Sequence, residues 1–294
     1  MTVPAIASPT DAADDRGAYT GTSAWSRFSR HRKGVISLAI LLLIGLAVGL
    51  GPSIYGIDPT AIDLVNTVGA SSATHPLGTD ENGRDVLARL LEGGRVSLMV
   101  GLAAMTVVVC LGIVFGASAG FFGGWIDRIV VQIVDGMMAV PLFFLWLIML
   151  TSFRPTPVMI VLVIGCTSWM TTARVVRSEV LKARELEFVE AARSLGASRL
   201  RLLLRHCLPQ AGSSIIVSAT LAAAFAIISE SALSFLGIGI QPPRPSWGNM
   251  LTGAQEYLFV APALALYPGI AIVLLVVSLN MLGDALRDVL SPRG

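Results

Sequence analysis

The chain has 294 residues, of which 54% are hydrophobic and 14% are charged, with a formal net charge of +2. This is too much apolar surface for a water-soluble globule of this length, so the composition indicates an integral membrane protein. The small net charge does not suggest a nucleic-acid-binding protein. The three cysteines are scattered and show neither a disulfide framework nor the spacing of metal ligands.

Apolar runs long enough to span a bilayer occur about six times, since a spanning helix needs roughly 20 mostly apolar residues. A long polar segment precedes the first run, so we expect that run to be retained as a span and not cleaved as a signal peptide. Residues 1–33 are predicted to form a disordered cytoplasmic tail, and residues 34–294 an all-α polytopic transmembrane domain. The predicted spans are 35–55, 97–120, 128–151, 157–176, 211–236 and 262–283.

Lys and Arg residues mark the cytoplasmic side of short membrane loops. They are concentrated before the first span and in the loop 178–209, between the fourth and fifth spans. The loops near 56–96, 152–156 and 237–261 hold few, and acidic residues accompany those of the first loop. We therefore predict that both termini and the loop 178–209 are cytoplasmic, and that the other three loops are extracytoplasmic.

The basic cytoplasmic loop has the pattern of two short helices joined by a glycine turn. Apolar residues recur with helical spacing over 178–195, and Gly196 is expected to end this helix in a left-handed conformation. Ser198 is suited to cap a second helix, and Pro209 is expected to end it. On its charge pattern alone, this unit fits either an amphipathic element on lipid headgroups or a docking surface for a cytoplasmic protein.

The same loop resembles the EAA loop in permease subunits of ABC-type importers. Segments 75–98 and 230–251 are similar to signatures of the second permease subunit of dipeptide and oligopeptide importers. The resemblance runs from about residue 30 to the C-terminus and points to a DppC/OppC-type permease, with nickel-importer permeases as close relatives. At position 206 many importers have an apolar residue. The histidine here is similar to the peptide-importer branch, where histidine often occurs. The residues that match the EAA loop and would couple to an ATPase are Glu190, Ala191, Ala192, Gly196, His206, Leu208 and Pro209.

The resemblance implies the type I ABC importer permease fold in a bacterial cytoplasmic membrane. It also implies a homologous second permease that lines the same pathway, two ATP-binding subunits that receive the loop as a coupling helix, and an extracytoplasmic substrate-binding protein. Peptides are the expected cargo, with nickel as the alternative.

The sequence lacks the motifs that would make this chain an enzyme by itself. A P-loop requires a glycine-rich turn that ends in Gly-Lys-Ser/Thr, and neither lysine of the chain stands in that context. Neither a metalloprotease motif nor a nucleophile elbow is present. We therefore expect no catalytic residue, cofactor or metal site here, and we expect ATP and Mg to be bound by partner subunits.

Two carboxylates, Asp135 and Glu230, lie inside predicted spans, where an ionisable group is costly and is a functional candidate by default. One interpretation is proton or sodium coupling in a secondary transporter that works alone. The other is a structural pairing with serine, backbone or arginine at a helix interface. A non-transport scaffold that recruits a soluble protein through its basic loop is a third class of function.

Small residues and prolines give two further expectations about packing. Four glycines recur every four residues in and after the second span, which predicts a close contact with a neighbouring helix. The prolines before Trp247 are expected to keep that loop extended, with Trp247 as an anchor at the outer membrane interface. The four glycines are Gly112, Gly116, Gly120 and Gly124.

Overall fold

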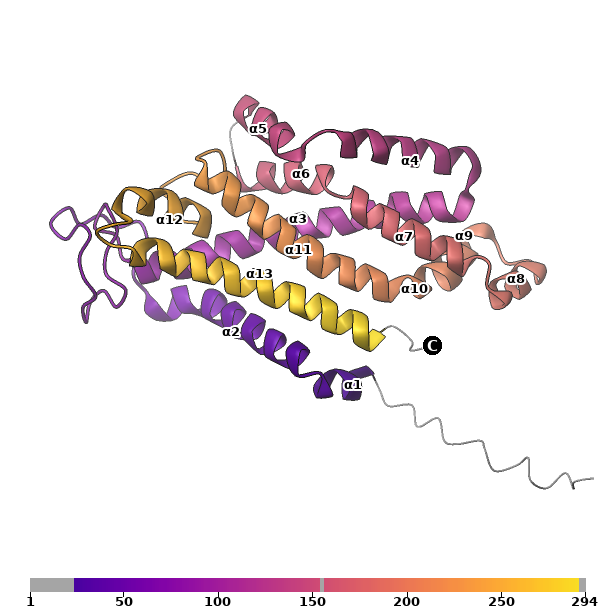
Figure 1. Cartoon of the computed structure of the whole chain (residues 1–294), viewed down its shortest axis with the longest axis horizontal. Coiled ribbons are helices and arrows are strands. Elements are labelled where there is room, and N and C mark those ends of the chain that lie inside the picture. The colour runs from indigo at the N-terminus through magenta and orange to yellow at the C-terminus, as the bar shows by residue number, and fades with distance from the viewer. Residues whose placement is uncertain (1–23, 154–155, 291–294) are drawn as a thin grey trace, which may run out of the picture.

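Residues 24–153 and 156–290 are described by a computed structural model, in which they form an elongated bundle of helices (Figure 1). The expected tail 1–33 lies mostly outside the described residues, and its last part, 24–33, is helical apart from His31. The first half of the chain contains α1 (Ala24–Arg30), α2 (Arg32–Tyr55), α3 (Val86–Phe122), α4 (Gly124–Ala139), α5 (Leu142–Ser152) and α6 (Pro157–Thr167).

The second half continues the bundle with shorter helices at both of its ends. Its elements are α7 (Met170–Ala183), α8 (Glu187–Ser194), α9 (Arg199–Leu202), the π-helix η1 (Leu203–Cys207), α10 (Leu208–Gln210), α11 (Gly212–Phe235), α12 (Trp247–Ala254), the 3-10 helix η2 (Gln255–Tyr257) and α13 (Ala263–Leu290).

Four of the described helices, α2, α3, α11 and α13, are long and apolar enough to cross a membrane. Two bent pairs bring the number of spans to as many as six: α4 with α5, which meet at 82°, and α6 with α7, which meet at 44°. The first bend falls at Val140 and Pro141, where the proline ring removes an amide donor and disfavours a helical residue before it. The all-α polytopic fold predicted from the sequence is confirmed.

Helix α3 lies in the middle of the bundle and packs against α7, α11 and α6. The glycine repeat faces α7, as predicted for a close helix contact: a Cβ added at Gly116 would lie 2.4 Å from the Ala173 carbonyl oxygen. Gly112 and Gly120 meet α7 in the same way. Gly124 does not, because it is the first residue of α4 and has open space around it, so this part of the prediction is wrong.

One end of the bundle, which we call the loop end, consists of residues 56–85 and α12 (Figure 1). Its core contains a buried ionic cluster in which Asp80 pairs with Arg84 at 2.7 Å and with Arg89 at 3.1 Å. Asp85 caps α3 by accepting from the Ala88 amide. These bonds fix the long loop to the start of α3.

Trp247 does not act as an interfacial anchor, which corrects the expectation from its position after the prolines. It is 2% exposed, and its indole N–H donates to the Leu90 carbonyl at 2.8 Å. The reason is the short helix α12, which the sequence analysis missed. Ser246 and Asn249 form a capping box at its start, and this places Trp247 against α3.

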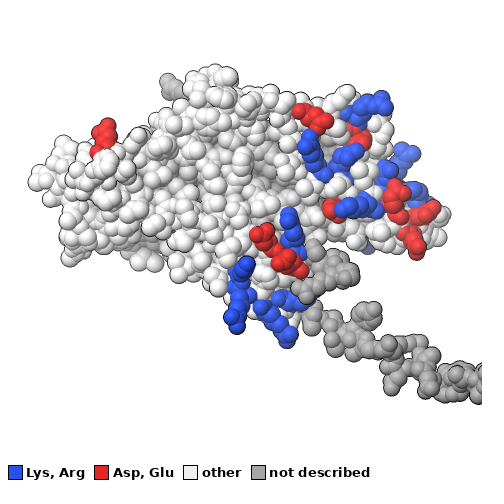
Figure 2. Space-filling model, in the orientation of Figure 1, with Lys and Arg blue, Asp and Glu red and all other residues white. Residues whose placement is uncertain are grey.

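The opposite end, which we call the basic end, holds α8, α9 and η1. In the view of Figure 2, Lys and Arg side chains gather over this end and over the neighbouring start of the chain. The residues responsible include those of α1 and α2, at positions 27, 30, 32 and 33, and those of α7 to η1. The two basic stretches of the sequence therefore lie at the same end of the molecule.

Candidate functional site: the α8–α9 element and an adjoining cavity

The loop that resembles an EAA loop folds as a compact helical element between α7 and α11. The sequence predicted one continuous helix over 178–195, and the structure corrects this. Helix α7 ends at Ala183, and α8 begins only after Leu186, whose backbone is extended. Arg184, the residue after α7, donates from Nη1 to the Gly120 carbonyl near the end of α3, at 3.3 Å. This contact comes from a distant part of the chain and is invisible in the local sequence pattern.

Gly196 has the left-handed conformation predicted for it, with a φ of 85°. Its amide donates to the Arg193 carbonyl, and the Ala197 amide donates to the Ala192 carbonyl. These two bonds are those of a Schellman motif, in which the residue after the helix cap turns left-handed and satisfies the last carbonyls. The turn reverses the chain sharply between α8 and α9.

Ser198 caps α9 as predicted, by accepting from the Arg201 amide at 3.4 Å. Pro209, in contrast, does not end the second helix. The backbone widens to a π turn at η1, in which the Leu208 amide donates to the Leu203 carbonyl five residues earlier. A π turn accommodates a residue that breaks the regular ladder of hydrogen bonds. The helix therefore continues past Pro209, through α10 and towards α11.

The α8–α9 element has a buried face and an exposed apolar face. Buried residues of α8, α9 and η1 pack against α7 and complete a small core. The other face leaves leucines in the open, with Leu195 at 89% exposure. The buried set is Val189, Leu202, Leu203 and Cys207, and the exposed apolar set is Phe188, Leu195, Leu200 and Leu204.

The residues that match the EAA loop lie along this element and are accessible to different degrees. Glu190, Ala191 and Pro209 are exposed, and Ala192 is half-buried. His206 and Leu208 are also half-buried, and the His206 ring lies 6.3 Å from that of Phe188.

Cys207, in contrast, is fully buried beneath the EAA residues. Its burial raises the pKa of the thiol above its ordinary value, and the positive charges of Arg193 and Arg184 offset only part of this.

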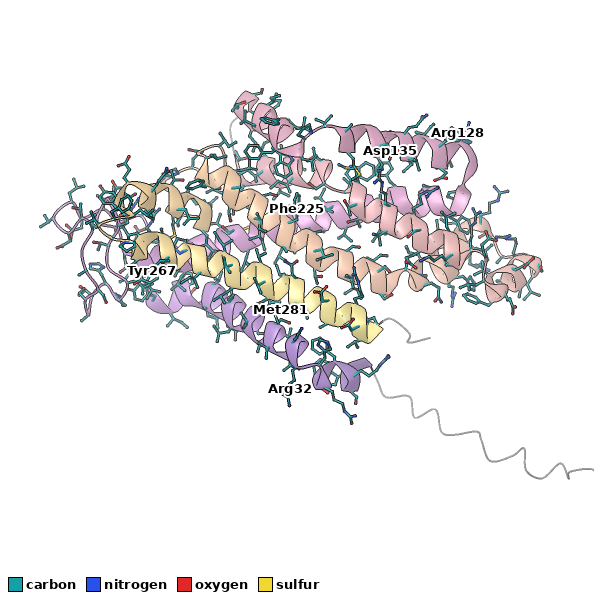
Figure 3. The ribbon with its side chains drawn as sticks, in the orientation of Figure 1. Arg32, Arg128, Asp135, Phe225, Tyr267 and Met281 are labelled. Carbon is teal, nitrogen blue, oxygen red and sulfur yellow. The ribbon has the colours of Figure 1, made fainter. Side chains whose placement is uncertain are left out.

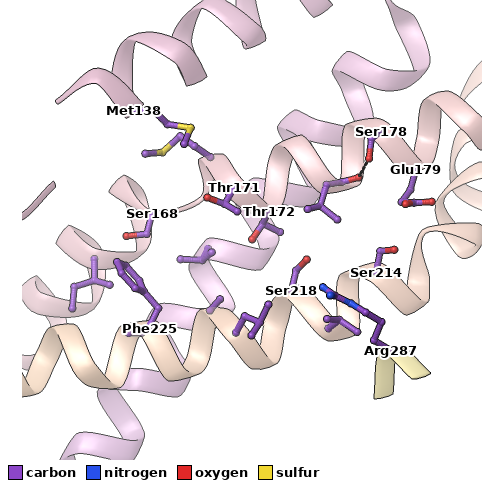
Figure 4. Close-up of a pocket in the computed structure, with 18 of the residues that line it drawn as sticks. Met138, Ser168, Thr171, Thr172, Ser178, Glu179, Ser214, Ser218, Phe225 and Arg287 are labelled. Carbon is purple, nitrogen blue, oxygen red and sulfur yellow. Dashed lines mark hydrogen bonds between the residues drawn. The ribbon is translucent and has the colours of Figure 1, made fainter. Parts of the chain in front are cut away.

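A cavity of about 720 Å³ opens beside this element, between α7 and α11 (Figure 4). Its end near α5 is lined by apolar side chains, including Met138 and Phe225, and its end near α13 by Glu179 and Arg287. Hydroxyl groups of α6, α7 and α11 line the space between these ends. They belong to Ser168, Thr171, Thr172, Ser178, Ser213, Ser214 and Ser218.

The sequence analysis did not select these hydroxyl residues. A signal was available in the serines and threonines within 168–172 and 213–218, which lie within or beside apolar spans. The sequence alone did not show the crossing of α7 and α11 that turns both groups of hydroxyls towards one space.

Asp135 lies outside this cavity, on the side of α4 near α7, where Figure 3 labels it. Its carboxylate accepts from Arg174 Nη2 at 2.5 Å. A pairing with arginine was one of the structural roles considered for Asp135.

Glu230 is fully buried where α11, α12 and α3 meet. The Ser234 hydroxyl donates to its Oε1 at 2.7 Å, and Ser97 and Ser246 lie beside the same carboxyl group. Ser234 also accepts from the Ile240 amide, which ties the loop before α12 to the same site. The surroundings are those of the serine pairing considered for this residue.

The family of the chain is decided by comparison with known proteins. A family model described as a binding-protein-dependent transport system inner membrane component matches residues 112–293. The chain belongs to this family. A second model, described as the N-terminal TM domain of oligopeptide transport permease C, matches residues 21–70. Membership makes the chain a permease subunit of the inner membrane and not an enzyme, and it implies ATPase and substrate-binding partners in general.

Relatives of known name cover almost the whole of this permease. It is 35% identical over 279 residues to the dipeptide transport system permease protein DppC of Alkalihalophilus pseudofirmus, covering 94% of this chain and 92% of that one. It is 37% identical over 270 residues to the glutathione transport system permease protein GsiD of Pectobacterium atrosepticum, covering 92% and 90%. The resemblance to DppC/OppC-type permeases is confirmed.

A solved structure shows the same fold at greater distance. A chain of the MetNI methionine ABC transporter in an inward-facing conformation aligns with a TM-score of 0.55 and 19% identity. The alignment covers 68% of this permease and 95% of that chain. The type I ABC importer permease fold expected from the sequence is thereby confirmed.

Proposed function

We propose that this permease forms half of a translocation pathway for short peptides and couples it to two ATPase subunits through the α8–α9 element. A homologous second permease completes the pathway, and an extracytoplasmic binding protein delivers the cargo. Because neither lysine of the sequence stands in a Gly-Lys-Ser/Thr context, we assign the binding of ATP and Mg to the ATPase partners. The names of the dipeptide and glutathione relatives support peptides, and not nickel, as the cargo class.

The observation that carries this proposal is the exposed apolar face of the α8–α9 element. Leu195, Leu200 and Leu204 are each more than half exposed, beside the acidic Glu190 and a series of basic residues. An apolar patch with a charged rim is typical of a protein interface. The small side chains at Ala191 and Ala192 permit a partner to approach the helix backbone closely. We therefore assign this face to an ATPase subunit and not to lipid headgroups.

The proposed pathway runs past the cavity between α7 and α11. Seven hydroxyl groups can donate hydrogen bonds to a peptide backbone and accept them from it, and these groups carry no charge. The cavity adjoins the coupling element through α7, which leads into α8 after residues 184–186. A movement of the coupling element is thus passed to α7, which lines the space through which cargo passes.

The alternative of an ion-coupled secondary transporter draws no support from Asp135 and Glu230. Asp135 is paired with Arg174, and Glu230 is surrounded by serines at the loop end. Purified and reconstituted alone, the chain should neither hydrolyse ATP nor take up peptides. Uptake by the chain alone, driven by a proton or sodium gradient, would establish the alternative.

The orientation is tested by thiol labelling of intact cells. Cysteines are placed at Ser194, in the last turn of α8, and at Ser71, in the loop end; both positions are exposed, and the three native cysteines are replaced. With α8 and both termini in the cytoplasm, a membrane-impermeant reagent should label only position 71. Labelling of position 194 in unbroken cells would reverse the topology and remove the docking argument.

The coupling role is tested in the reconstituted complex with Gly196→Val and Glu190→Lys. A valine at a φ of 85° is strained although open space surrounds it, so α9 should be misplaced while the bundle stays folded. Lysine at 190 reverses a charge on the docking face. We expect peptide uptake to be lost. Either the ATPase subunits dissociate from the complex, or ATP hydrolysis no longer responds to the loaded binding protein. Gly45→Val, also in open space but in α2, is the control. Normal uptake and assembly in both variants would reject the proposal.

A further inference from the structure

Three arginines, two on α7 and one directly after it, contact the hairpin formed by α3 and α4. Arg184 donates to the Gly120 carbonyl where α3 ends. Arg177 binds Asp127 in the first turn of α4 with two hydrogen bonds, of 2.5 Å from Nε and 2.7 Å from Nη2. Arg174 binds Asp135 two turns further along α4. Spacings of three and seven residues place the arginines on one side of α7.

Helix α4 has few buried side chains of its own. Of its 16 residues only Val130 and Val134 are buried, and most of its other apolar side chains are half-exposed or exposed. The two valines join one apolar cluster with residues of α3 and α7, and the two carboxylates add polar contacts with α7. A bidentate arginine–carboxylate pair also fixes the relative orientation of the two groups, which a single hydrogen bond does not.

The position of the second pair indicates what this face of α4 meets in the transporter. Asp135 lies 11 residues after the first residue of α4, or about 17 Å along the helix at 1.5 Å per residue. Asp135 and Arg174 have side-chain exposures of 58% and 52%. Because charges at such depth are costly in hydrocarbon, this face meets protein or water and not lipid tails.

The two paired helices connect the α8–α9 element to the wall of the cavity. At one end, α7 leads into α8 through residues 184–186. At the other, α4 leads through the 82° bend into α5, and Met138 and Leu142, on either side of that bend, line the cavity. A displacement of α8 carried by α7 therefore reaches the bend through α4 if α4 follows α7.

We infer that the pairs Arg177–Asp127 and Arg174–Asp135, which we call the α7–α4 clasp, make these helices move as one unit, so that displacement of the coupling element shifts the cavity wall at the α4–α5 bend. The four residues are positioning residues and need not touch the cargo. The inference rests on the proposed coupling function, because it requires α8 to be moved by a partner.

The test uses the complete reconstituted transporter, with peptide uptake and ATP hydrolysis measured on the same vesicles. Arg177→Glu and Asp127→Arg each place like charges together, and the double variant restores an opposite pair in reversed order. We expect each single variant to lose at least tenfold in uptake per ATP hydrolysed, while the subunits still co-purify. The double variant should regain at least a third of the wild-type ratio.

Lys182→Glu is the matched control, because it changes the charge of α7 by the same amount without touching α4. Lys182 is 73% exposed, and its ion pair is with Glu179 on its own helix. The control should keep the wild-type ratio of uptake to hydrolysis. Wild-type ratios in both single variants would overturn the inference, and so would single losses that the double variant does not restore.

A cross-link separates joint movement from a static contact. Cysteines replace Arg177 and Asp127 in a background without native cysteines, and a short bifunctional thiol reagent joins them. If α7 and α4 move together, uptake should be low before cross-linking and should rise at least threefold after it. A fall to zero would mean that the helices separate during the cycle, and would reject the clasp.

Failure of the proposed function would look different in these experiments. It would appear as a wild-type complex without peptide uptake, or as normal coupling in Gly196→Val. Failure of the clasp alone leaves the wild-type complex active and Gly196→Val uncoupled.

Discussion

The loop end and the basic end of this permease use the same two devices, ion pairs and left-handed glycines, in different surroundings. At the loop end, Asp80, Arg84 and Arg89 are all below 10% exposure, and both arginines bind Asp80 inside the fold. Towards the basic end, between α4 and α7, the pair between Asp135 and Arg174 is more than half exposed and joins two separate helices.

The left-handed glycines of the two ends differ in the same way, one being enclosed and the other open. A Cβ at Gly83, in the loop end, would lie 1.8 Å from the Asp63 carbonyl oxygen, whereas a Cβ at Gly196 meets no atom within 4 Å. The loop end is therefore built as a fixed block, in which charges and turns hold the fold. The basic end leaves the same groups available for a partner and for movement.

The largest expected effect is that of Asp80→Ala, which leaves Arg84 and Arg89 buried without their shared carboxylate. Breaking a buried ion pair in this way costs about 3–5 kcal/mol. The measurement is denaturant unfolding in detergent micelles. Glu92→Ala is the control, because its pair with Arg95 is open to solvent and 3.7 Å long, and such a pair contributes less than about 1 kcal/mol. Similar losses in both variants would remove the contrast between buried and exposed pairs.

Gly83→Ala and Gly196→Ala compare two glycines with similar φ values, 74° and 85°. A left-handed alanine costs about 1–2 kcal/mol at either position. At Gly83 the collision with the Asp63 carbonyl adds about 1–3 kcal/mol, because the backbone must move. The same unfolding assay should rank Gly83→Ala as the more damaging change by at least that added amount. Equal costs would show that the loop end yields as readily as the basic end.

Glu230 tests whether the loop end depends on hydrogen bonding or on charge. Glu230→Ala deprives the Ser234 hydroxyl of its acceptor in a buried site, at a cost of about 1–3 kcal/mol. Glu230→Gln keeps an acceptor of the same shape, so stability and peptide uptake should stay close to wild type. Loss of uptake in a stable Glu230→Gln protein would instead assign the carboxyl group a role in transport.

The smallest effect is expected for Cys207 at the basic end, and it concerns the rate at which a reagent modifies the thiol. The thiolate is the species that reacts, so a buried thiol with a raised pKa should react slowly at neutral pH and faster as the pH rises towards that pKa. A maleimide should label Cys207 at least tenfold more slowly than a cysteine placed at the exposed Ser194. Comparable rates would mean that the core under α8 opens readily.

The local chemistry of the sequence was sufficient for the parts of the fold that depend on neighbouring residues. The spans, the left-handed turn at Gly196 and the cap at Ser198 all follow from hydrophobic length or from a single residue type. The break before α8 did not, and beside it Arg184 contacts the Gly120 carbonyl, 64 residues away in the chain. Trp247 was misplaced for a different reason: the short helix α12, which places it against α3 and the Leu90 carbonyl, was missed.

The same distinction, between features that depend on neighbouring residues and features that depend on distant ones, applies to the candidate site. The EAA residues stand close together in the sequence and were predicted as one group. The hydroxyl-lined cavity and the α7–α4 clasp bring together residues that are far apart in the chain, and only the helix packing shows which of them meet. For Asp135 and Glu230, the sequence alone did not show which groups they contact.

The π turn at Leu203–Cys207 has a consequence for how the length of this segment is constrained. The helical backbone runs from Arg199 to Phe235 with one turn residue, Ala211, so η1 holds one residue more than a regular helix would need there. Deleting that surplus residue would let the π turn close into a regular α turn, so α9 and the docking face would keep their present direction. Deleting one residue from the regular part of α11 has no such turn to absorb it, and would rotate α9 relative to the rest of α11 by about 100° around the helix axis and shift it by about 1.5 Å. The π turn is thus the place where this segment tolerates a change in length.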